Sequence, residues 1–232
     1  MRKIRTFSND KELVIQRRNH IVKVATGLIA KKGYNRVNTR ELATALGMST
    51  GGLYHYIGSK EDILYLIINF TTDLTSQVLE RFTAYLKDVT PIVAIIESVR
   101  IYIETIDNYR DFHNFLNHIM LSLSINDRKI IYQAESRVVE YFENLLQSGV
   151  EKGEFEIQDT KIVAHNIIAF AHTWANRGWY LKRYYTYERY AQEEIAILLQ
   201  QITKLSRKSI EKTIARYYSQ DNKTNELLMD EP

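Results

Sequence analysis

The chain has 232 residues, enough for one large domain or two modest ones, and its 45% hydrophobic and 25% charged residues are typical of a soluble globular protein. It contains no cysteine, which excludes disulfides, thiolate metal sites and a cysteine nucleophile. Basic residues at the N-terminus are not followed by an apolar segment, and no apolar run approaches the ~18 residues that span a bilayer. We therefore expect a cytoplasmic protein.

The net charge of +3 is unevenly distributed along the chain. Residues 1–64 hold 12 Lys and Arg against 5 Asp and Glu, a net +7, whereas the remaining 168 residues carry a net −4. A basic N-terminal segment on an acidic body favours a polyanion as the partner of that segment. Charge alone would fit a solvated basic surface equally well. The sequence motifs are therefore needed to distinguish a polyanion-binding segment from such a surface.

Helix-breaking residues are scarce, because the chain has only 2 prolines and 9 glycines. This scarcity predicts a helical protein. Six of the glycines fall within 32 residues near the N-terminus: Gly27, Gly33, Gly47, Gly51, Gly52 and Gly58. That region must therefore be built from short elements and tight turns.

The first predicted helices are short and well delimited. Apolar residues recur at helical spacing from Ile21 to Ile29, and this helix ends at Gly33 after a lysine pair. A second helix is predicted from Asn38, with Asn38 or Thr39 as its cap, to Gly47. Two short helices joined by a glycine turn in a basic segment predict a helix-turn-helix.

The third predicted helix, over 48–57, has Ser49 as its cap and contains two consecutive glycines. Gly51 and Gly52 near a helix start cost roughly 1 kcal/mol each, so a purely structural helix would not favour them. They make sense where another backbone, such as that of DNA, comes very close. A fourth helix is predicted after Gly58, with Ser59 as its cap.

This segment resembles the DNA-binding region of the TetR family of transcriptional regulators. Nearly every spaced position of the family pattern matches over about 45 residues. Thr50 stands where the family often has lysine, and Gly52 where it often has threonine or serine, which bears on the operator sequence that is read. The matching residues are Gly33-Tyr34, Arg40-Glu41-Leu42-Ala43, Ala45-Leu46-Gly47-Met48-Ser49, Gly51-Gly52-Leu53-Tyr54-His55-Tyr56 and Ser59-Lys60-Glu61-Asp62-Ile63-Leu64.

The resemblance implies contacts with double-stranded operator DNA. By position, Thr39 and Lys60 correspond to phosphate contacts at helix starts, and Tyr54 and His55 to a pair that touches phosphates or base edges. Tyr56 fits either a DNA contact or the domain core. A basic N-terminal arm with Arg2, Lys3 and Arg5 can add to the DNA contacts. The full expected set is Thr39, Arg40, Thr50, Gly51, Gly52, Tyr54, His55, Tyr56 and Lys60.

Further helices are predicted over about 91–109, 111–123, 126–149, 160–183 and 187–207. The expected fold class is therefore all-α, with about nine helices. The domain organisation that we predict has a three-helix DNA-binding domain over 1–64, a ligand-binding and dimerisation domain over 65–218, and a disordered tail over 219–232.

The resemblance also implies a homodimer, because the last two long helices of TetR regulators usually form a four-helix bundle across a two-fold axis. Paired recognition helices would then read a palindromic operator. The alternative is that some of the candidate residues belong to the core of a single chain. The candidates are Ile162, His165, Ile168, Ala169, His172, Ile195, Leu198, Leu199 and Ile202.

The segment 174–185 is dense in aromatic and cationic residues. One interpretation is a large, partly apolar pocket with cations near its mouth, which suits an acyl- or aromatic-coenzyme A thioester. The segment is similar to the C-terminal region of TetR regulators of fatty-acid and related thioester catabolism. The other interpretation assigns the aromatic residues to core and interface. The candidate ligand contacts are Tyr102, Tyr109, His113, Phe115, Met120, Phe170, Trp174, Arg177 and Arg183.

Three other functions were weighed against this one: a regulator of efflux that responds to hydrophobic or cationic drugs, a helical enzyme, and a membrane-surface protein. The six histidines are scattered, and no His-Glu-x-x-His motif, P-loop or dinucleotide fingerprint occurs. We therefore expect no enzyme activity, cofactor or metal. A membrane-surface protein would have no use for the matched glycines and caps. The prediction is a repressor that a small-molecule effector releases from its operator.

Overall fold

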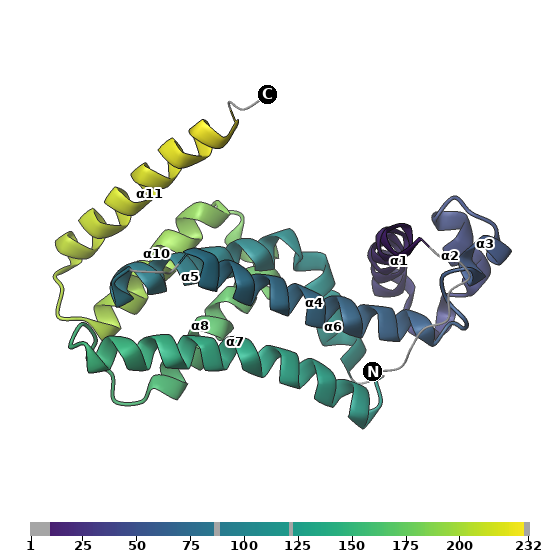
Figure 1. The fold of residues 1–232 in the computed structure, drawn as a ribbon, viewed down its shortest axis with the longest axis horizontal. Helices are drawn as coiled ribbons and strands as arrows, with labels where there is room; N and C mark the ends of the chain where they lie inside the picture. The colour runs from purple at the N-terminus through teal and green to yellow at the C-terminus, as the bar shows by residue number, and fades with distance from the viewer. Residues whose placement is uncertain (1–9, 86–88, 121–122, 230–232) are drawn as a thin grey trace. The chain divides into compact units, whose positions relative to one another are not determined.

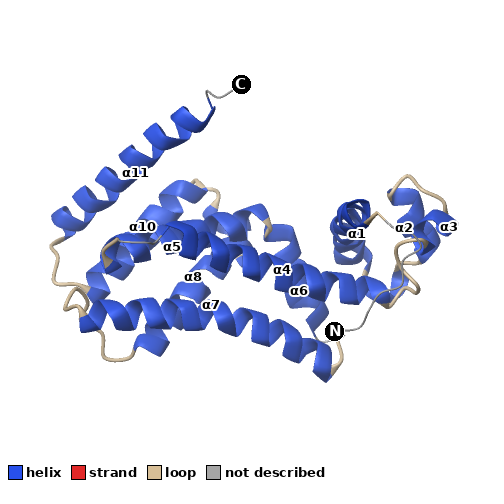
Figure 2. Ribbon diagram, in the orientation of Figure 1, coloured by secondary structure: helices blue, strands red, loops and turns tan. Residues whose placement is uncertain are grey.

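The structure is a computed structural model that describes residues 10–85, 89–120 and 123–229, and helix is the only regular secondary structure among them (Figures 1 and 2). The all-α class expected from the sequence is confirmed. Within the described ranges, no helix is both long and apolar enough to cross a membrane. The N-terminal arm with Arg2, Lys3 and Arg5 lies outside the described residues.

The helices are α1 (Lys11–Lys32), α2 (Thr39–Ala45), α3 (Thr50–Tyr54), α4 (Asp62–Tyr85), α5 (Pro91–Asn108), α6 (Arg110–Ile119), α7 (Ile125–Glu151), α8 (Thr160–Asn176), α9 (Gly178–Leu181), α10 (Tyr187–Ile202) and α11 (Arg207–Met229), with a 3-10 turn η1 at Tyr34–Arg36.

The chain forms two compact units, and neither is a continuous segment. The first unit comprises Met1–Leu79 and Tyr109–Val138, and the second Glu80–Asn108 and Val139–Pro232. This division differs from the expected boundary after residue 64. The first unit also takes in most of α4, all of α6 and the first half of α7.

The core of the first unit explains this division. The buried face of α1, with Ile21 and Ala25 at 0% exposure, belongs to one apolar cluster with Phe115 and Ile119 of α6. The two helices lie against each other. Because α6 covers an apolar face that the helix-turn-helix alone would leave in water, it packs as part of the first unit.

The second unit is built around α5, which packs against α8 and α10 (Figure 1). Ile95, Val99, Ile103 and Ile106 of α5 are all at 0% exposure. Apolar residues surround this helix rather than forming one stripe, as expected of a helix that neighbours cover on several sides. α5 is therefore the central element of this unit.

Two predicted helices end earlier than expected. The helix predicted over 160–183 is interrupted at Arg177, which leaves the helical region at φ −110° and ψ 11°, and Gly178 begins the short α9. The helix predicted over 187–207 ends at Ile202, because Thr203 is extended at φ −128° and ψ 162°. The Thr203 hydroxyl accepts a hydrogen bond from the Leu205 N–H at 3.2 Å, which stabilises this break.

The C-terminal segment also differs from the expectation. α11 runs to Met229, so residues 219–229 are helical where a disordered tail was predicted. The polar composition of this segment suggested disorder, but the helix starts upstream, where Ile210 and Ile214 are buried at 0% and 6% exposure. A helix that is anchored by its first turns can continue into a polar sequence, since propagation is easier than nucleation.

The packing of the second unit can be tested at Gly149, near the end of α7, where the backbone lies close to Phe155. A Cβ added at Gly149 would overlap the ring of Phe155, which is buried at 2% exposure. We expect Gly149→Ala to lower the free energy of unfolding by ~1–3 kcal/mol through overpacking. Gly27→Ala is the matched control, because a Cβ added there meets no atom within 4 Å. Thermal melts of both variants would measure the difference, and equal melting temperatures would contradict the packing.

Candidate nucleic-acid interface and effector pocket

The helix-turn-helix consists of α2 and α3, and capping side chains fix the start of both helices. The Glu41 N–H donates to the Asn38 side-chain oxygen at 2.9 Å, and the Gly52 N–H donates to the Ser49 Oγ at 3.0 Å. Between the helices, Gly47 has φ 67°, a conformation that glycine adopts without strain. The sequence predicted Ser49 as a cap and left Asn38 or Thr39 open, and the structure selects Asn38.

The two glycines of α3 are not equivalent. Gly51 is exposed, and a Cβ added there would lie 3.9 Å from the nearest atom, the Ser49 Oγ. A Cβ at Gly52 would lie 3.3 Å from the same oxygen, which is tighter than most contacts. Packing within the chain therefore does not require glycine at position 51. The predicted contact of Gly51 with DNA stays a prediction.

The structure brings together two of the predicted DNA contacts from different helices. The Tyr54 hydroxyl at the end of α3 lies 3.4 Å from the Thr39 Oγ1 at the start of α2. Tyr54 is 38% exposed, and Arg40 and His55 are exposed as well. Leu53, between these residues, is fully buried and anchors α3 to the core. The polar side chains of α2 and α3 therefore face solvent on an anchored scaffold.

Two other predicted DNA contacts have structural roles in this unit. Tyr56 is half-buried and packs against the apolar core, which favours the core interpretation. The Lys60 Nζ donates to the Tyr34 carbonyl oxygen at 2.8 Å and lies 4.4 Å from the centre of the Tyr34 ring. Burial, followed by the charge of Glu61, raises the pKa of Tyr34 to about 12. Lys60 thus ties the segment before α4 to η1, and its phosphate contact stays a prediction.

Two polar groups around the turn between α3 and α4 make contacts that were not predicted from the sequence. The Asp62 carboxylate is 3% exposed and accepts hydrogen bonds from the N–H groups of Gly58 at 2.7 Å and Ser59 at 3.2 Å. Asp62, not Ser59, is therefore the side chain that holds this turn. Arg18 donates from Nε to the Tyr56 carbonyl at 3.1 Å. Burial lowers the pKa of Arg18, and the charge of Asp62 opposes that shift.

The residues proposed for the dimer interface fall into two groups. On α8, Ile162 is 58% exposed, His165 and Ala169 are exposed, and Ile168 and His172 are half-buried. The four α10 candidates are already in the core of the single chain, so their assignment to the interface is wrong. Packing against α5 decides this, because all four are at 3% exposure or less: Ile195, Leu198, Leu199 and Ile202.

The nine predicted ligand contacts are divided between the two units. Tyr109, His113, Phe115 and Met120 belong to the first unit, where Phe115 is 2% exposed in the core shared by α1 and α6. The other five belong to the second unit: Tyr102, Phe170, Trp174, Arg177 and Arg183.

Trp174 lies in the core of the second unit and has polar partners there. Its ring is 1% exposed, stacks on Tyr190 at 4.9 Å, and donates from Nε1 to the Asp107 Oδ1 at 2.9 Å. The Lys182 Nζ lies 3.2 Å from the same carboxylate oxygen. These contacts favour the core interpretation of Trp174 over a pocket wall.

Tyr102 is buried as well, and its hydroxyl lies 3.1 Å from the His172 Nε2. Burial lowers the pKa of His172, which favours a neutral ring. Arg177 and Arg183 are exposed. Of the five candidates of the second unit, Tyr102 and Trp174 are core residues, Phe170 is half-buried, and the two arginines are exposed.

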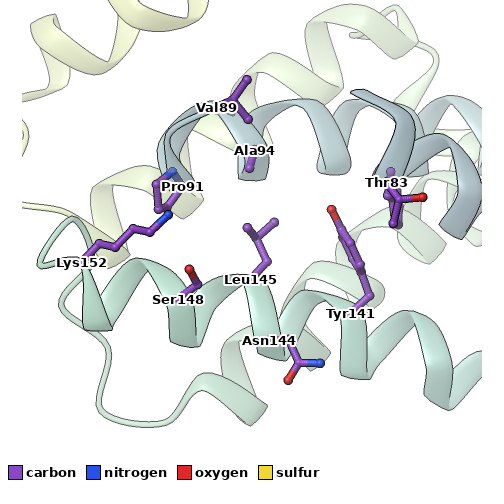
Figure 3. A pocket seen from close by; sticks show the side chains of 10 residues that line it. Thr83, Val89, Pro91, Ala94, Tyr141, Asn144, Leu145, Ser148 and Lys152 are labelled. Atoms are coloured by element: carbon purple, nitrogen blue, oxygen red, sulfur yellow. The ribbon is translucent and has the colours of Figure 1, made fainter. Parts of the chain in front are cut away.

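A cavity of about 390 Å³ lies elsewhere in the second unit, between the end of α4, the start of α5 and α7 (Figure 3). The stacked rings of Phe82 and Tyr141, with centroids 4.5 Å apart, form one wall. The Tyr141 hydroxyl lies 2.8 Å from the Ser98 Oγ, and burial raises the pKa of Tyr141. The lining residues, none of which was predicted from the sequence, are Phe82, Thr83, Val89, Pro91, Ala94, Tyr141, Asn144, Leu145, Ser148 and Lys152.

Comparison with known proteins agrees with both parts of this description. Residues 21–65 match the family of bacterial regulatory proteins, tetR family, and residues 89–183 match the tetracyclin repressor-like C-terminal domain. The chain is 26% identical over 197 residues to the HTH-type transcriptional regulator HbdR of Aromatoleum sp. (strain CIB), covering 85% of each chain. It is 26% identical over 141 residues to the HTH-type transcriptional repressor KstR2 of Rhodococcus jostii (strain RHA1), covering 60% of this chain and 68% of the relative.

The fold is also similar to solved structures. The crystal structure of AibR in complex with isovaleryl coenzyme A and operator DNA has a TM-score of 0.66 and 23% identity, covering 80% of this chain and 99% of AibR. A helix-turn-helix and a helical C-terminal domain, each matched by its own family, define a DNA-binding transcriptional regulator rather than an enzyme. The chain belongs to the TetR family of ligand-responsive transcriptional regulators.

The exposed glycine of α3 gives a test of the DNA-facing surface. We expect Gly51→Ala to fold normally, because helix propensity favours alanine by ~1 kcal/mol and the added Cβ meets only ordinary contacts. Operator affinity should nevertheless fall about tenfold or more, roughly 1.4 kcal/mol, because the methyl group occupies space needed by the DNA. Gly27→Ala in α1 is the matched control. Equal affinities of the two variants in a gel-shift titration would show that position 51 does not face DNA.

Proposed function

We propose that this protein is a homodimeric repressor that binds a palindromic operator in the cytoplasm and leaves it when a small-molecule effector binds in the second unit. The observation that carries this proposal is the polar surface of α2 and α3. Arg40, Tyr54 and His55 are exposed there, Thr39 is half-buried beside Tyr54, and internal packing does not require the glycine at position 51. The relative KstR2, which is named as a transcriptional repressor, supports repression rather than activation.

The homodimer is proposed on the exposed face of α8 and the residues that follow it. Ile162 is 58% exposed, and His165 and Ala169 share its surface at helical spacing. Trp179 and Tyr184 beyond α8 are 66% and 59% exposed, and Ile197 of α10 is 49% exposed. Large exposed aromatic and aliphatic side chains on neighbouring elements are typical of a protein–protein interface.

The effector site is proposed in the cavity between α4, α5 and α7. Its volume of about 390 Å³ is at the small end of the range for ligand pockets, ~300–1,000 Å³. Phe82 supplies an apolar wall. Leu145 supplies another, Asn144 and Ser148 supply hydrogen-bonding groups, and Lys152 supplies a cation (Figure 3). This chemistry suits the acyl or aryl group of an anionic ligand, and the phosphates of a larger ligand would remain outside.

An acyl- or aromatic-coenzyme A thioester is the effector class that we propose. It combines an apolar group that fits the cavity with anionic phosphates that a lysine attracts. The AibR structure, which contains isovaleryl coenzyme A together with operator DNA, supports this class by its similarity of fold. The predicted ligand contacts Arg177 and Arg183 do not line the cavity. Lys152 is therefore the cation that we propose for the phosphates.

Regulation of efflux in response to cationic drugs is the competing function. The residues that line the cavity include one lysine and no carboxylate. A cationic drug would meet a like charge there without an acidic partner, which costs affinity. The lining therefore favours anionic effectors over cationic ones.

The DNA-binding function is tested by selecting duplexes from a random library with the full-length protein. We expect a palindromic motif whose half-sites are one helical turn apart, ~34 Å, or a multiple of this distance. Tyr54→Ala should abolish binding to the selected duplex, since it removes an exposed aromatic contact, while gel filtration still shows a dimer. Retained binding would mean that Tyr54 is not a contact, a monomeric wild type would contradict the dimer, and failure to select any DNA would contradict the function.

The effector class is tested by adding acyl- and aryl-CoA thioesters, the corresponding free acids and coenzyme A alone to the protein–operator complex. We expect one thioester group to release the DNA at micromolar concentration. Leu145→Trp, which fills the cavity, should lose the response and keep operator affinity. Ile125→Trp at an exposed position of the same helix is the control. A full response of Leu145→Trp would place the effector elsewhere, and indifference to every thioester would overturn the class.

A further inference from the structure

The last helix, α11, is not covered by either family match, because the second match ends at residue 183 and α11 spans Arg207–Met229 (Figure 1). It nevertheless packs against α10. The Ser209 N–H donates to the Ser206 Oγ at 3.3 Å, which caps its start. Ile210 and Ile214, one turn apart, are buried at 0% and 6% exposure. α11 is thus docked on the second unit through its first turns.

A polar contact joins α11 to the central helix of the second unit. The Tyr217 hydroxyl donates to the Oε2 atom of Glu97 on α5. The Glu97 side chain is 4% exposed. Arg100 binds the same carboxylate with two hydrogen bonds, from Nε to Oε2 at 2.9 Å and from Nη2 to Oε1 at 2.7 Å. One oxygen of a buried carboxylate is therefore shared between α11 and Arg100.

The same set of charges continues from α5 to α4. The Arg100 Nη1 lies 3.9 Å from the Glu104 Oε2, and Arg81 of α4 donates from Nη2 to that oxygen at 3.0 Å. Tyr217, Glu97, Arg100, Glu104 and Arg81 thus form a continuous chain from α11 through α5 to α4. All five residues belong to the second unit. Tyr217 and Arg100 bind the same carboxylate, and Arg100 shares Glu104 with Arg81.

The docking of α11 is suited to local detachment. In its described part, two isoleucines supply the fully buried apolar contacts, so few contacts hold the helix compared with those around α5. Segments with few buried apolar contacts open locally at a lower free energy than the core. Glu97 is fixed on α5, and when α11 detaches its carboxylate loses the Tyr217 donor and is left with Arg100 alone of these two partners. The hydrogen bond from Tyr217 to Glu97 links the docking of α11 to the charged residues of α5 and α4.

We propose that α11 is a latch whose docking, through Tyr217 and Glu97, restrains α4 and thereby raises operator affinity. The proposal rests on the function proposed above. α4 starts at Asp62, directly after the recognition helix, and carries Arg81 near its other end. With α11 docked, Glu104 holds Arg81, and α4 samples fewer conformations. Less conformational entropy is then lost when both recognition helices bind DNA. Detachment frees α4, so that DNA binding must order it again and affinity falls.

The test compares Tyr217→Phe with Tyr132→Phe in the full-length protein. Tyr217→Phe removes only the hydroxyl group that donates a hydrogen bond to Glu97. Tyr132, a 54% exposed tyrosine on α7, serves as the matched control. We expect amide hydrogen exchange to become faster in residues 210–217 and in residues 78–83 of α4 for Tyr217→Phe alone. Affinity for the duplex selected by the wild type should fall about 3–10-fold.

A second variant tests whether the effect travels through the charges. Arg81→Gln should lower operator affinity to a similar extent, and the double variant Tyr217→Phe/Arg81→Gln should be no weaker than either single variant. Independent sites would instead give multiplied losses. Faster exchange in α11 with unchanged DNA affinity, or multiplied losses in the double variant, would overturn the latch. If the wild type selects no DNA at all, the proposed function fails, whereas normal DNA binding by both single variants refutes the latch alone.

Discussion

A buried carboxylate at the start of α4 fixes the geometry on which DNA recognition depends. Asp62, 3% exposed, accepts hydrogen bonds from two consecutive backbone N–H groups of the turn between α3 and α4. The Arg18 side chain holds the end of α3 through the Tyr56 carbonyl and contributes the opposite charge. A buried charge is tolerated where hydrogen bonds and a counter-charge compensate its desolvation. These hydrogen bonds fix the turn between the recognition helix and α4 and the position of α1 against the end of α3, because hydrogen bonds are directional whereas apolar packing is not.

Polar contacts of the same kind organise the second unit around α5. Glu97 with Arg100 and Tyr217, Tyr102 with His172, and Ser98 with Tyr141 each join α5 to a different element. Apolar packing makes this unit compact, and the polar pairs specify which face of α5 each neighbour meets. The stacked Tyr141 and Phe82 rings then form a wall of the cavity, so the same contacts that orient α7 also shape the proposed effector site.

The proposed regulation needs one element that both DNA and effector influence, and α4 is that element. It begins beside the recognition helix at Asp62 and contributes Phe82 and Thr83 to the cavity. An effector can shift the protein between two conformers only if it binds one of them more tightly. A ligand between α4 and α7 meets this condition if the cavity changes shape when α4 moves. The proposed latch acts on the same helix through Arg81, which gives the chain a second input on α4.

The sequence by itself determined the local features of this protein. Glycine positions, helix caps and the basic charge of residues 1–64 identified the helix-turn-helix, since these signals act within a few residues of one another. Apolar periodicity predicted the all-α fold but could not assign a partner to each apolar face. Ile195 and Leu199 therefore read equally well as interface or core, and packing against α5 decided for the core.

Only the tertiary structure decided which distant residues meet. It assigned Phe115 to the DNA-binding unit through α1, and gave Trp174 the partner Asp107, 67 residues away. It also formed the cavity from segments that no motif marks, and docked α11 on Glu97, 120 residues earlier in the chain. Contacts of this kind leave no pattern in a single sequence, because burial and pairing depend on how whole helices pack, whereas caps and turns depend on neighbouring residues alone.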